Sequence, residues 1–591
     1  MGGLSRWIRR DAVEEGGAVN VDATTVEVIK GALIYAAEEM GIALRKSAYS
    51  PNIKERMDHS CALFDRERRL IAQAEHIPVH LGSMALAVRE GLSRYPGELE
   101  LGDMLLLNDP YISGTHLPDL TLIAPVFHEG TVIGYAANKA HHTDVGGKAP
   151  GSIAGDSTEL YQEGLIIPPV RFIRGGEIDG DLARLIQSNV RTPETQMGDL
   201  RAQIAANNTG SRRLLELVDE YGVELLEASM AAIMDYSERR MRAEIGALAD
   251  GVYEAVDWME DTGSGSEPAA ITVKIEVKGE EISFDYAGTS PQVEGPVNAP
   301  LGVTLAGIYY TLISITDPTI PVNDGCFRPI SLRIPEGCMM NPRRPAPVAG
   351  GNVETSQRNV DVLLKALSEA APDRVPAAGP GTMSNISLGG LREDGSPWTF
   401  YETVGGGSGG RPASDGVDGV HVNMTNTMNT PIEAMEAYLP LRFVAYGLRP
   451  DTGGPGEWRG GCGIERSWTL TGPRATLSIL AERVKIPPWG LRGGGSGALG
   501  EYILERADGS TERLPSKCTI PLRRGETLHI RTPGGGGYGD PFARRPEHVL
   551  RDVRNGLVGI ESAKEDYGVI IDAESLEVLD SETEEYRSNR K

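Results

Sequence analysis

The sequence predicts a mixed α+β, multidomain protein with an α/β N-terminal half and a β-rich, glycine-rich C-terminal half. Its 591 residues are too many for one compact core. The N-terminal half combines helical hydrophobic spacing with short apolar runs of strand length. Beyond about residue 400, short strand-like runs alternate with glycine blocks, which we interpret as tight turns.

The first predicted element is an amphipathic helix that follows a leader of residues 1–21. Thr24 and Glu27 match a capping box, apolar residues then recur at helical spacing, and Gly41 is expected to end the helix. A strand pair is predicted between residues 61 and 72, where an apolar run, a polar turn and a second apolar run follow one another.

The next elements complete an N-terminal domain, which we place at residues 22–250. Apolar runs of strand length occur at 101–108, 120–127 and 132–138. A long helical stretch at 211–245 follows them, with a stripe of core-facing apolar residues.

The pattern of apolar and polar residues changes after Gly251. Alternating apolar and polar residues predict a hairpin formed by 271–277 and 281–286, and helices are expected at 303–315 and 353–371. We therefore assign a central α+β domain to residues 251–400, a β-rich domain to 401–550, and a C-terminal tail, as a short helix or an extended segment, to 551–591.

Composition excludes several classes of function. The net charge of −25 disfavours nucleic-acid binding, which needs a basic surface. Five scattered cysteines without a C-x-x-C pair disfavour a disulfide framework and a cysteine zinc site. No apolar run approaches the ~20 residues of a membrane span, and Arg9-Arg10 is not followed by a signal-like segment. We expect a cytoplasmic protein.

Histidines mark the candidate site, because four of only ten lie between residues 116 and 142. If residues 129–130 form the two-residue turn of a hairpin, Asp119 pairs with Ala140, and His116 lies level with Thr143. The polar clusters at the two strand ends then meet at the open end of one hairpin.

Two imidazoles and one carboxylate without a fourth obligatory ligand are typical of an open catalytic metal site. Such a site could also be the facial triad of a non-haem iron oxygenase. Strand alternation alone favours His142 over His141 as the partner of Asp119, but strand ends often break alternation. Asp144 or Asp109 could orient a ligand histidine. Surface histidines on a non-catalytic scaffold remain the alternative interpretation.

Several ordered strings resemble the hydantoinase B/oxoprolinase family over about residues 22–545. They are SPNIKERMD (50–58), GTHLPD (114–119), HHTDVGG (141–147), GGNVETSQ (350–357), ERVKIPPWG (482–490) and TPGGGGYGDP (532–541). The resemblance implies an ATP-dependent partner, a hydantoinase A-type subunit with an actin-like ATPase fold, in a hetero-oligomer. That partner phosphorylates a substrate carbonyl, and the B-type subunit completes the reaction at a divalent metal.

Carried onto this sequence, the resemblance implies that His116, Asp119 and His141 bind the metal. Asp58 is then a fourth ligand or the partner of a water molecule. We expect one divalent ion, zinc or manganese, with ATP used by the partner subunit. The resemblance favours His141 over His142 and leaves His142 as a neighbour in the catalytic site.

The expected reaction is ring opening of a hydantoin, 5-oxoproline or another lactam. Asp144 and Glu55 are the candidate proton acceptors. The alternative within the family is ATP-dependent carboxylation of a ketone, which the shorter length of this chain mildly disfavours. Arg358 and Arg483 could bind an anionic intermediate or form structural ion pairs, and the sequence does not decide between these roles.

Overall fold

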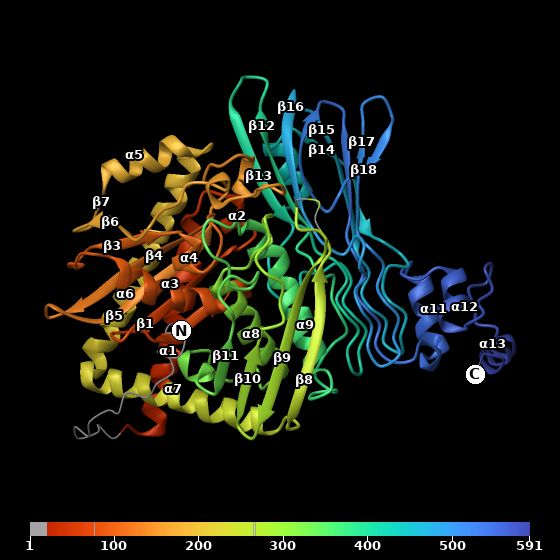
Figure 1. Cartoon of the computed structure of the whole chain (residues 1–591), viewed down its shortest axis with the longest axis horizontal. Helices are drawn as coiled ribbons and strands as arrows, with labels where there is room; N and C mark the ends of the chain where they lie inside the picture. Colours follow the sequence, from red (N-terminus) through yellow and green to blue (C-terminus); the bar gives the residue numbers. More distant parts are fainter. Residues whose placement is uncertain (1–20, 76, 264, 266, 591) are drawn as a thin grey trace.

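The computed structural model describes residues 21–75, 77–263, 265 and 267–590. In this part of the chain the architecture is mixed α+β, as predicted, with four β-sheets and helices packed against them. Figure 1 shows the N-terminal sheet and its helices beside the central sheet, with the C-terminal strands beyond them. The predicted leader lies outside the described residues, except for Val21.

The N-terminal sheet is antiparallel, with strand order β2-β1-β5-β4-β3-β6-β7. Its strands are β1 (His59–Asp65), β2 (Leu70–Glu75), β3 (Met104–Leu107), β4 (Asp119–His128), β5 (Thr131–His141), β6 (Val170–Arg174) and β7 (Glu177–Ile178). Helices α1 (Ala23–Ser47), α6 (Pro193–Tyr221) and α7 (Val223–Gly246) share an apolar core with one face, and α3 (Leu81–Arg94) packs on the other. The predicted strand pair and the three later strands are confirmed as β1 to β5.

The first helix begins and ends at different residues from those that the sequence pattern predicts. The Asp22 side chain accepts hydrogen bonds from the backbone N–H groups of Thr24 and Thr25, so Asp22 caps the helix and Thr24 does not. The helix also continues past Gly41 to Ser47. Gly41 lies on the buried face, where tertiary packing outweighs the ~1 kcal/mol helix-propensity cost of a glycine.

The predicted helical stretch 211–245 is two helices. α6 ends at Tyr221 and α7 begins at Val223, because Gly222 has a φ of +77°, which a right-handed helix cannot contain. α6 also begins well before the predicted stretch, at Pro193, a residue suited to the first helical turn. The short helices α2 (Pro51–Lys54), α4 (Pro110–Ser113) and α5 (Gly180–Asn189) complete this half.

The central sheet has the order β11-β10-β9-β8 and packs against two helices. Its strands are β8 (Gly251–Met259), β9 (Ala269–Lys278), β10 (Glu281–Asp285) and β11 (Ile330–Arg333), and the helices are α8 (Leu301–Ile315) and α9 (Ser356–Leu367). The predicted hairpin is therefore confirmed as β9 and β10. A π-helical turn at Gly351–Thr355 leads into α9.

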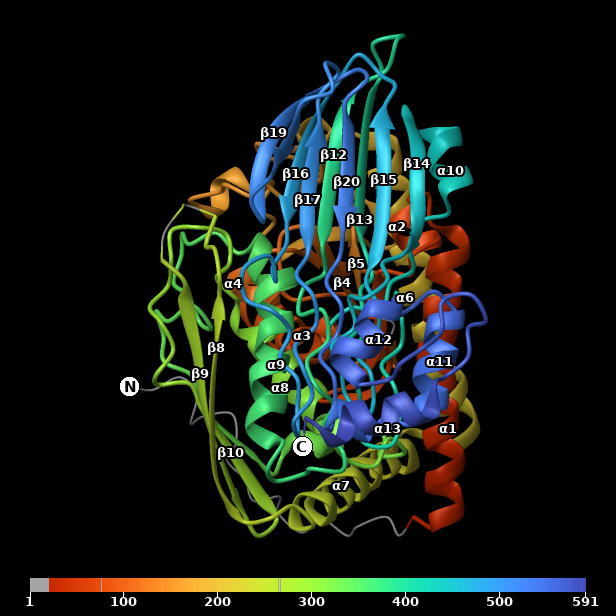
Figure 2. The same cartoon turned by 90° about the vertical axis from the view of Figure 1, so that its right-hand side faces the viewer.

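The C-terminal strands form two sheets that share one apolar core, as in a β-sandwich (Figure 2). One sheet contains β12 (Asn385–Leu391), β13 (Pro397–Thr403), β16 (Arg474–Leu480) and β19 (Lys517–Arg523). The other contains β14 (Leu441–Leu448), β15 (Ile464–Leu470), β17 (Glu501–Glu505), β18 (Thr511–Arg513) and β20 (Thr527–Arg531), with α10 (Ile432–Tyr438) beside β14.

The glycine blocks are close-packed segments, and the prediction of tight turns is wrong for most of them. A Cβ atom on Gly535 would lie 2.0 Å from the Ser408 carbonyl oxygen, and one on Gly407 would lie 1.8 Å from that of Gly461. None of the glycines in 405–410 or 534–537 has a positive φ. These segments run side by side below the sandwich (Figure 1), and glycine is needed there for backbone contact, not for a turn.

The C-terminal segment contains more structure than the short helix or tail expected. α11 (Pro546–Arg554), α12 (Ile560–Tyr567) and α13 (Asp580–Ser588) lie beyond the close-packed glycine segments (Figure 1), with a small apolar core. All five cysteines are buried. Within the described part of the chain, no helix is both long and apolar enough to cross a bilayer.

Candidate metal centre

A β-bulge sets the register of the hairpin that carries two of the predicted ligands. The turn at residues 129–130 is present, and both residues have the positive φ of a type I′ turn. The pairing then shifts by one residue between Val126 and Phe127, so that Ile133 is an extra residue in β5.

Because of this bulge, Asp119 lies opposite His141, and its predicted pairing with Ala140 is wrong. A shift of one residue reverses which side chains of a strand share a face. The conflict between strand alternation and the choice of His141 therefore disappears. In the observed register His141, and not His142, is the partner of Asp119.

His116 reaches the same point from the loop before β4. The preceding helix ends at Gly114 with a φ of +76°, and the N–H of Asp119 then donates to the His116 carbonyl at 3.1 Å. On the other strand, the N–H of His141 donates to the Asp58 carbonyl at 3.0 Å. Backbone hydrogen bonds thus hold both strand ends and the Asp58 segment together.

Three donor atoms converge in a nearly equilateral triangle. The Nε2 atom of His116 lies 3.1 Å from Oδ1 of Asp119 and 3.1 Å from Nδ1 of His141, and the third edge, from Nδ1 of His141 to Oδ1 of Asp119, is 3.2 Å. Tetrahedral ions with bonds of about 2.0–2.2 Å have ligand atoms about 3.3–3.6 Å apart, and octahedral ions about 2.8–3.1 Å. The observed edges fall between these ranges.

Hydrogen bonding alone does not explain this triangle. Two ring nitrogens and a carboxylate oxygen all face one point, and a contact between two ring nitrogens holds at most one proton. All three side chains are almost completely buried, so water does not compensate for the unshared lone pairs. Of the described residues with such side chains, His116, Asp119 and His141 are the group that could hold a metal ion.

The protonation states of the triangle suit a metal ligand set. Burial opposes ionisation of Asp119, but His116 beside it outweighs burial and holds the pKa of the carboxyl well below its usual range. Burial lowers the pKa of His141, which favours the neutral ring. Burial alone lowers the pKa of His116 too, yet the Asp119 carboxylate raises it overall. An anionic oxygen and a neutral imidazole are the donor forms that divalent ions require.

The triangle opens onto a small cavity of about 20 Å³. This volume suits one ion or water molecule but not a substrate ring. Its polar lining comes from the N-terminal, central and β-rich parts of the chain. The polar lining residues are Asp58, His80, His116, Asp119, His141, Asn352, Tyr401, Thr403, Thr425 and Thr427. Asp58 lies outside the triangle but lines the same cavity.

Arg56 ties the β-rich half to this cavity. Its guanidinium is buried and donates to the Tyr401 carbonyl at 2.8 Å and to Oγ1 of Thr403 at 2.8 Å. It also reaches Asn52 Oδ1 at 3.3 Å and Thr427 Oγ1 at 3.4 Å. Without Arg56, the lining residues Tyr401, Thr403 and Thr427 would therefore lose their hydrogen bonds to the segment that carries Asp58.

Two of the residues predicted as catalytic lie away from the cavity. Glu55 is exposed at the end of α2. His142 is buried, but its Nε2 lies 2.9 Å from Oε1 of Gln203, on α6. Neither lines the cavity that the triangle opens onto.

The two carboxylates predicted to orient a ligand histidine have structural partners instead. Asp144 is buried, accepts backbone N–H groups of its own loop, and pairs with Arg191 at 2.9 Å. Asp109 caps α4 and pairs with Arg344. Asp144 as a proton acceptor therefore has no geometric support.

The cavity contains residues that sequence reasoning missed. His80 and Tyr401 carried no signal beyond their residue type, since each is far in sequence from the predicted ligands. Asn352, in the cavity, and Arg56, which binds two of its lining residues, lay inside strings that carried the resemblance, GGNVETSQ and SPNIKERMD, and could have been found there.

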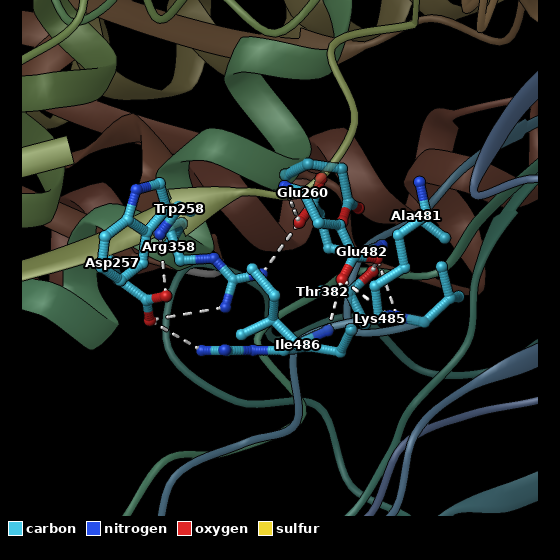
Figure 3. A network of polar contacts seen from close by, with 12 residues as sticks. Asp257, Trp258, Glu260, Arg358, Thr382, Ala481, Glu482, Lys485 and Ile486 are labelled. Atoms are coloured by element: carbon cyan, nitrogen blue, oxygen red, sulfur yellow. Dashed lines mark hydrogen bonds and ion pairs between the residues drawn. The ribbon is translucent and has the colours of Figure 1, made fainter. Parts of the chain in front are cut away.

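Arg358 and Arg483 form buried ion pairs. Arg358 donates to Oε2 of Glu482 at 3.0 Å (Figure 3). Arg483 lies 2.6 Å from Oδ2 of Asp361 and 3.1 Å from Oδ2 of Asp257. Both arginine side chains are fully buried among these carboxylates. Of the two roles left open, the structure therefore supports the structural ion pair.

The same network joins distant segments. Lys517 of β19 pairs with Glu482, and Glu260, just after β8, accepts the backbone N–H groups of Val484, Lys485 and Ile486. The central sheet and the sandwich are thus connected by charges that lie out of contact with water (Figure 3).

Comparison with known proteins gives consistent matches over the chain. A family model described as Hydantoinase B/oxoprolinase matches residues 22–541. An uncharacterized protein of Methanocaldococcus jannaschii is 48% identical over 554 residues, which cover 93% of this chain and 96% of the relative. The caprolactamase subunit beta of Pseudomonas jessenii is 34% identical over 563 residues, which cover 93% of this chain and 97% of the relative.

Length differs among the relatives. 5-Oxoprolinase 1 of Arabidopsis thaliana is 37% identical over 546 residues, and these cover 88% of this chain but 42% of that protein. The chain thus spans less than half the length of this relative. Among solved structures, the ATP-dependent caprolactamase from Pseudomonas jessenii matches with a TM-score of 0.90 and 32% identity, covering 96% of this chain and 100% of that chain.

Proposed function

We propose, because the chain belongs to the hydantoinase B/oxoprolinase family, that it is the metal-dependent hydrolytic subunit of an ATP-dependent cyclic amidohydrolase. The single observation that supports the hydrolytic role is the buried triangle of His116, Asp119 and His141 donor atoms. The substrate class is a hydantoin, 5-oxoproline or another lactam.

We propose that His116, Asp119 and His141 hold one divalent ion, zinc or manganese. When bound, such an ion polarises a substrate oxygen and lowers the pKa of a water molecule towards ~7. Asp58 is the remaining carboxylate of the cavity, so it is the group that orients the attacking water and accepts its proton. This role replaces that of Glu55 and Asp144, which have no place in the cavity.

A phosphorylating partner is part of the proposal. A cyclic amide resists attack because its nitrogen donates electrons into the carbonyl group, and phosphorylation of the carbonyl oxygen removes that resonance. The glycine blocks of this chain lack the G-x-x-x-x-G-K-[ST] spacing that cradles nucleotide phosphates. ATP is therefore used by a hydantoinase A-type subunit, in line with relatives named as a subunit beta or carrying this region within a longer chain.

The test uses the chain purified together with its co-expressed ATPase partner. Hydantoins, 5-oxoproline and caprolactam are incubated with and without ATP, and ring opening is measured. We expect ATP-dependent hydrolysis that His116→Ala removes, whereas His128→Ala, at the far end of the same hairpin, leaves it unchanged. Full hydrolysis by the His116→Ala complex would sink the proposal.

Labelled bicarbonate separates the carboxylase alternative. A hydrolase opens the ring without incorporating label, whereas a ketone carboxylase fixes label into its product in the presence of ATP. Incorporation of label with a ketone substrate, and no ring opening of any lactam, would assign this chain to the carboxylase branch instead.

A further inference from the structure

His80 reaches the candidate metal centre from behind Asp119. It lies at the junction of the 3-10 turn Pro78–His80 and α3, is 1% exposed, and lines the cavity. Its Nδ1 lies 3.0 Å from Oγ of Ser60, a buried residue of β1. Its Nε2 faces Oδ2 of Asp119 at 3.6 Å.

These two neighbours fix the tautomer of the ring. The Asp119 carboxylate, as a metal ligand, offers only lone pairs, so Oδ2 can accept a hydrogen bond but not donate one. A lone pair on Nε2 would repel the carboxylate oxygen, so Nε2 carries the hydrogen. A neutral ring with a hydrogen on Nε2 has an acceptor at Nδ1, and the Ser60 hydroxyl is placed to donate to it. The Ser60 hydroxyl thus stabilises the tautomer in which His80 presents Nε2–H to the carboxylate.

The two oxygens of Asp119 have different surroundings. Oδ1 is the atom within 3.1–3.2 Å of both ring nitrogens of the triangle. Oδ2 is buried and has no hydrogen-bond partner among the described residues, and the Nε2 atom of His80 likewise has none. A slightly shorter distance between Nε2 of His80 and Oδ2 of Asp119 would therefore form an N–H···O hydrogen bond. It would engage the carboxylate oxygen that does not belong to the triangle.

We propose that His80 is a positioning residue for the carboxylate ligand. Its Nε2–H holds Oδ2 of Asp119, so that Oδ1 is presented to His116 and His141, and Ser60 holds His80 in the tautomer that this requires. Partners of this kind fix the orientation of metal-bound side chains and keep their donor atoms preorganised. The inference rests on the proposed metal site, and it concerns metal affinity, not the choice of substrate.

The test is the zinc dissociation constant of the full-length chain, measured by chelator competition for the wild type, His80→Ala and His80→Gln. Loss of a partner of this kind typically weakens metal binding by about 10- to 100-fold, which we expect for His80→Ala. Glutamine places an N–H donor near the position of Nε2, so His80→Gln should recover most of the affinity. His80→Leu fills similar space without an N–H donor, so a purely space-filling role predicts that it recovers the affinity as well as His80→Gln does.

Ser60→Ala provides an independent test. It removes the hydroxyl that donates to Nδ1 of His80, so the tautomer with a hydrogen on Nε2 is no longer stabilised. We expect weaker zinc binding in Ser60→Ala, and no additional loss when it is combined with His80→Ala, since both act through one contact. With cobalt in place of zinc, the visible absorption bands should change in His80→Ala and return towards wild type in His80→Gln.

Each outcome is decisive. Wild-type zinc affinity in His80→Ala, or equal loss in His80→Ala and His80→Gln, overturns the role of His80. His116→Ala separates this from failure of the site itself: if it still binds zinc like the wild type, the proposed ligand set is wrong. If His116→Ala loses zinc while His80→Ala keeps it, only the inference about His80 fails. Should His80→Ala not fold, Ser60→Ala and His80→Gln carry the same comparison.

Discussion

The ring of Tyr401 stacks on the ring of His141, with centroids 4.7 Å apart and ring planes inclined by 15°. Tyr401 belongs to β13 of the sandwich, and His141 ends β5 of the N-terminal sheet. The tyrosine hydroxyl donates to Oδ1 of Asn385 at 2.7 Å, which fixes the ring from its far end. The sandwich therefore orients a side chain of the proposed metal site that the N-terminal half supplies.

Replacing this ring should loosen His141. Tyr401→Leu removes the stacking face, and we expect weaker zinc binding by about tenfold, since groups that orient a ligand contribute on this scale. Tyr401→Phe keeps the face and loses only the hydroxyl, so it is the matched control and should bind within about threefold of wild type. Chelator competition measures both, and equal affinities for the two variants would show that stacking does not orient the ligand.

Removal of the metal should abolish ring opening and lower thermal stability together. A ligand bound only by the folded chain stabilises it by about 2.7 kcal/mol at a hundredfold excess over its Kd. Dialysis against a chelator should therefore lower the unfolding temperature, and zinc or manganese should restore it. His116→Ala is the control, because its unfolding temperature should not respond to either ion. An unchanged wild-type unfolding temperature after verified metal loss would contradict the site.

The hairpin, and the proximity of Asp119 to His141, could be predicted from the sequence because their spacing is local. The two-residue turn and the apolar runs define β4 and β5, and they bring Asp119 near His141 in any plausible register. The register itself could not be predicted, since the bulge at Ile133 has no distinguishing residue type. That single extra residue decides between His141 and His142.

The remaining walls of the cavity could not be predicted because they come from distant segments. Nothing near Tyr401 in the sequence indicates that it will meet His141, which is 260 positions earlier. The glycine blocks show a different limit. Composition alone does not distinguish a glycine needed for a turn from one needed for close backbone contact, and at Gly535 the second reason applies.

The buried ion-pair network should contribute more to stability than a surface pair. Arg358→Met removes one of the two buried cations that pair with Glu482, the other being Lys517, and breaking a buried pair typically costs about 3–5 kcal/mol. Arg513 lies on the exposed strand β18 and pairs with Glu501 of β17. Breaking this surface pair in Arg513→Met should cost less than about 1 kcal/mol. Urea unfolding of both variants measures the difference, and similar midpoints would contradict a stabilising role for the network.

Glu354 should make stability fall as pH rises. Burial raises the pKa of its carboxyl from 4.5 to about 8, so between these values the folded chain holds a proton that the unfolded chain has lost. The folded state is then disfavoured as pH increases through this window. Glu354→Gln mimics the protonated form, and its unfolding temperature relative to wild type should rise from pH 5 to pH 8. Glu402→Gln is the control, because Glu402 is a buried carboxylate paired with Arg466.

The close-packed glycine segments should not tolerate a methyl group. A Cβ on Gly535 would lie 2.0 Å from a backbone carbonyl oxygen, a contact that no side-chain movement relieves, so Gly535→Ala should destabilise the chain by more than about 4 kcal/mol or prevent folding. Gly447 of β14 has no heavy atom within 4 Å of that position, and its φ is not positive. Gly447→Ala should therefore change stability by no more than about 1 kcal/mol. Soluble yield and thermal unfolding compare the two, and equal tolerance would mean that the glycine segments separate readily.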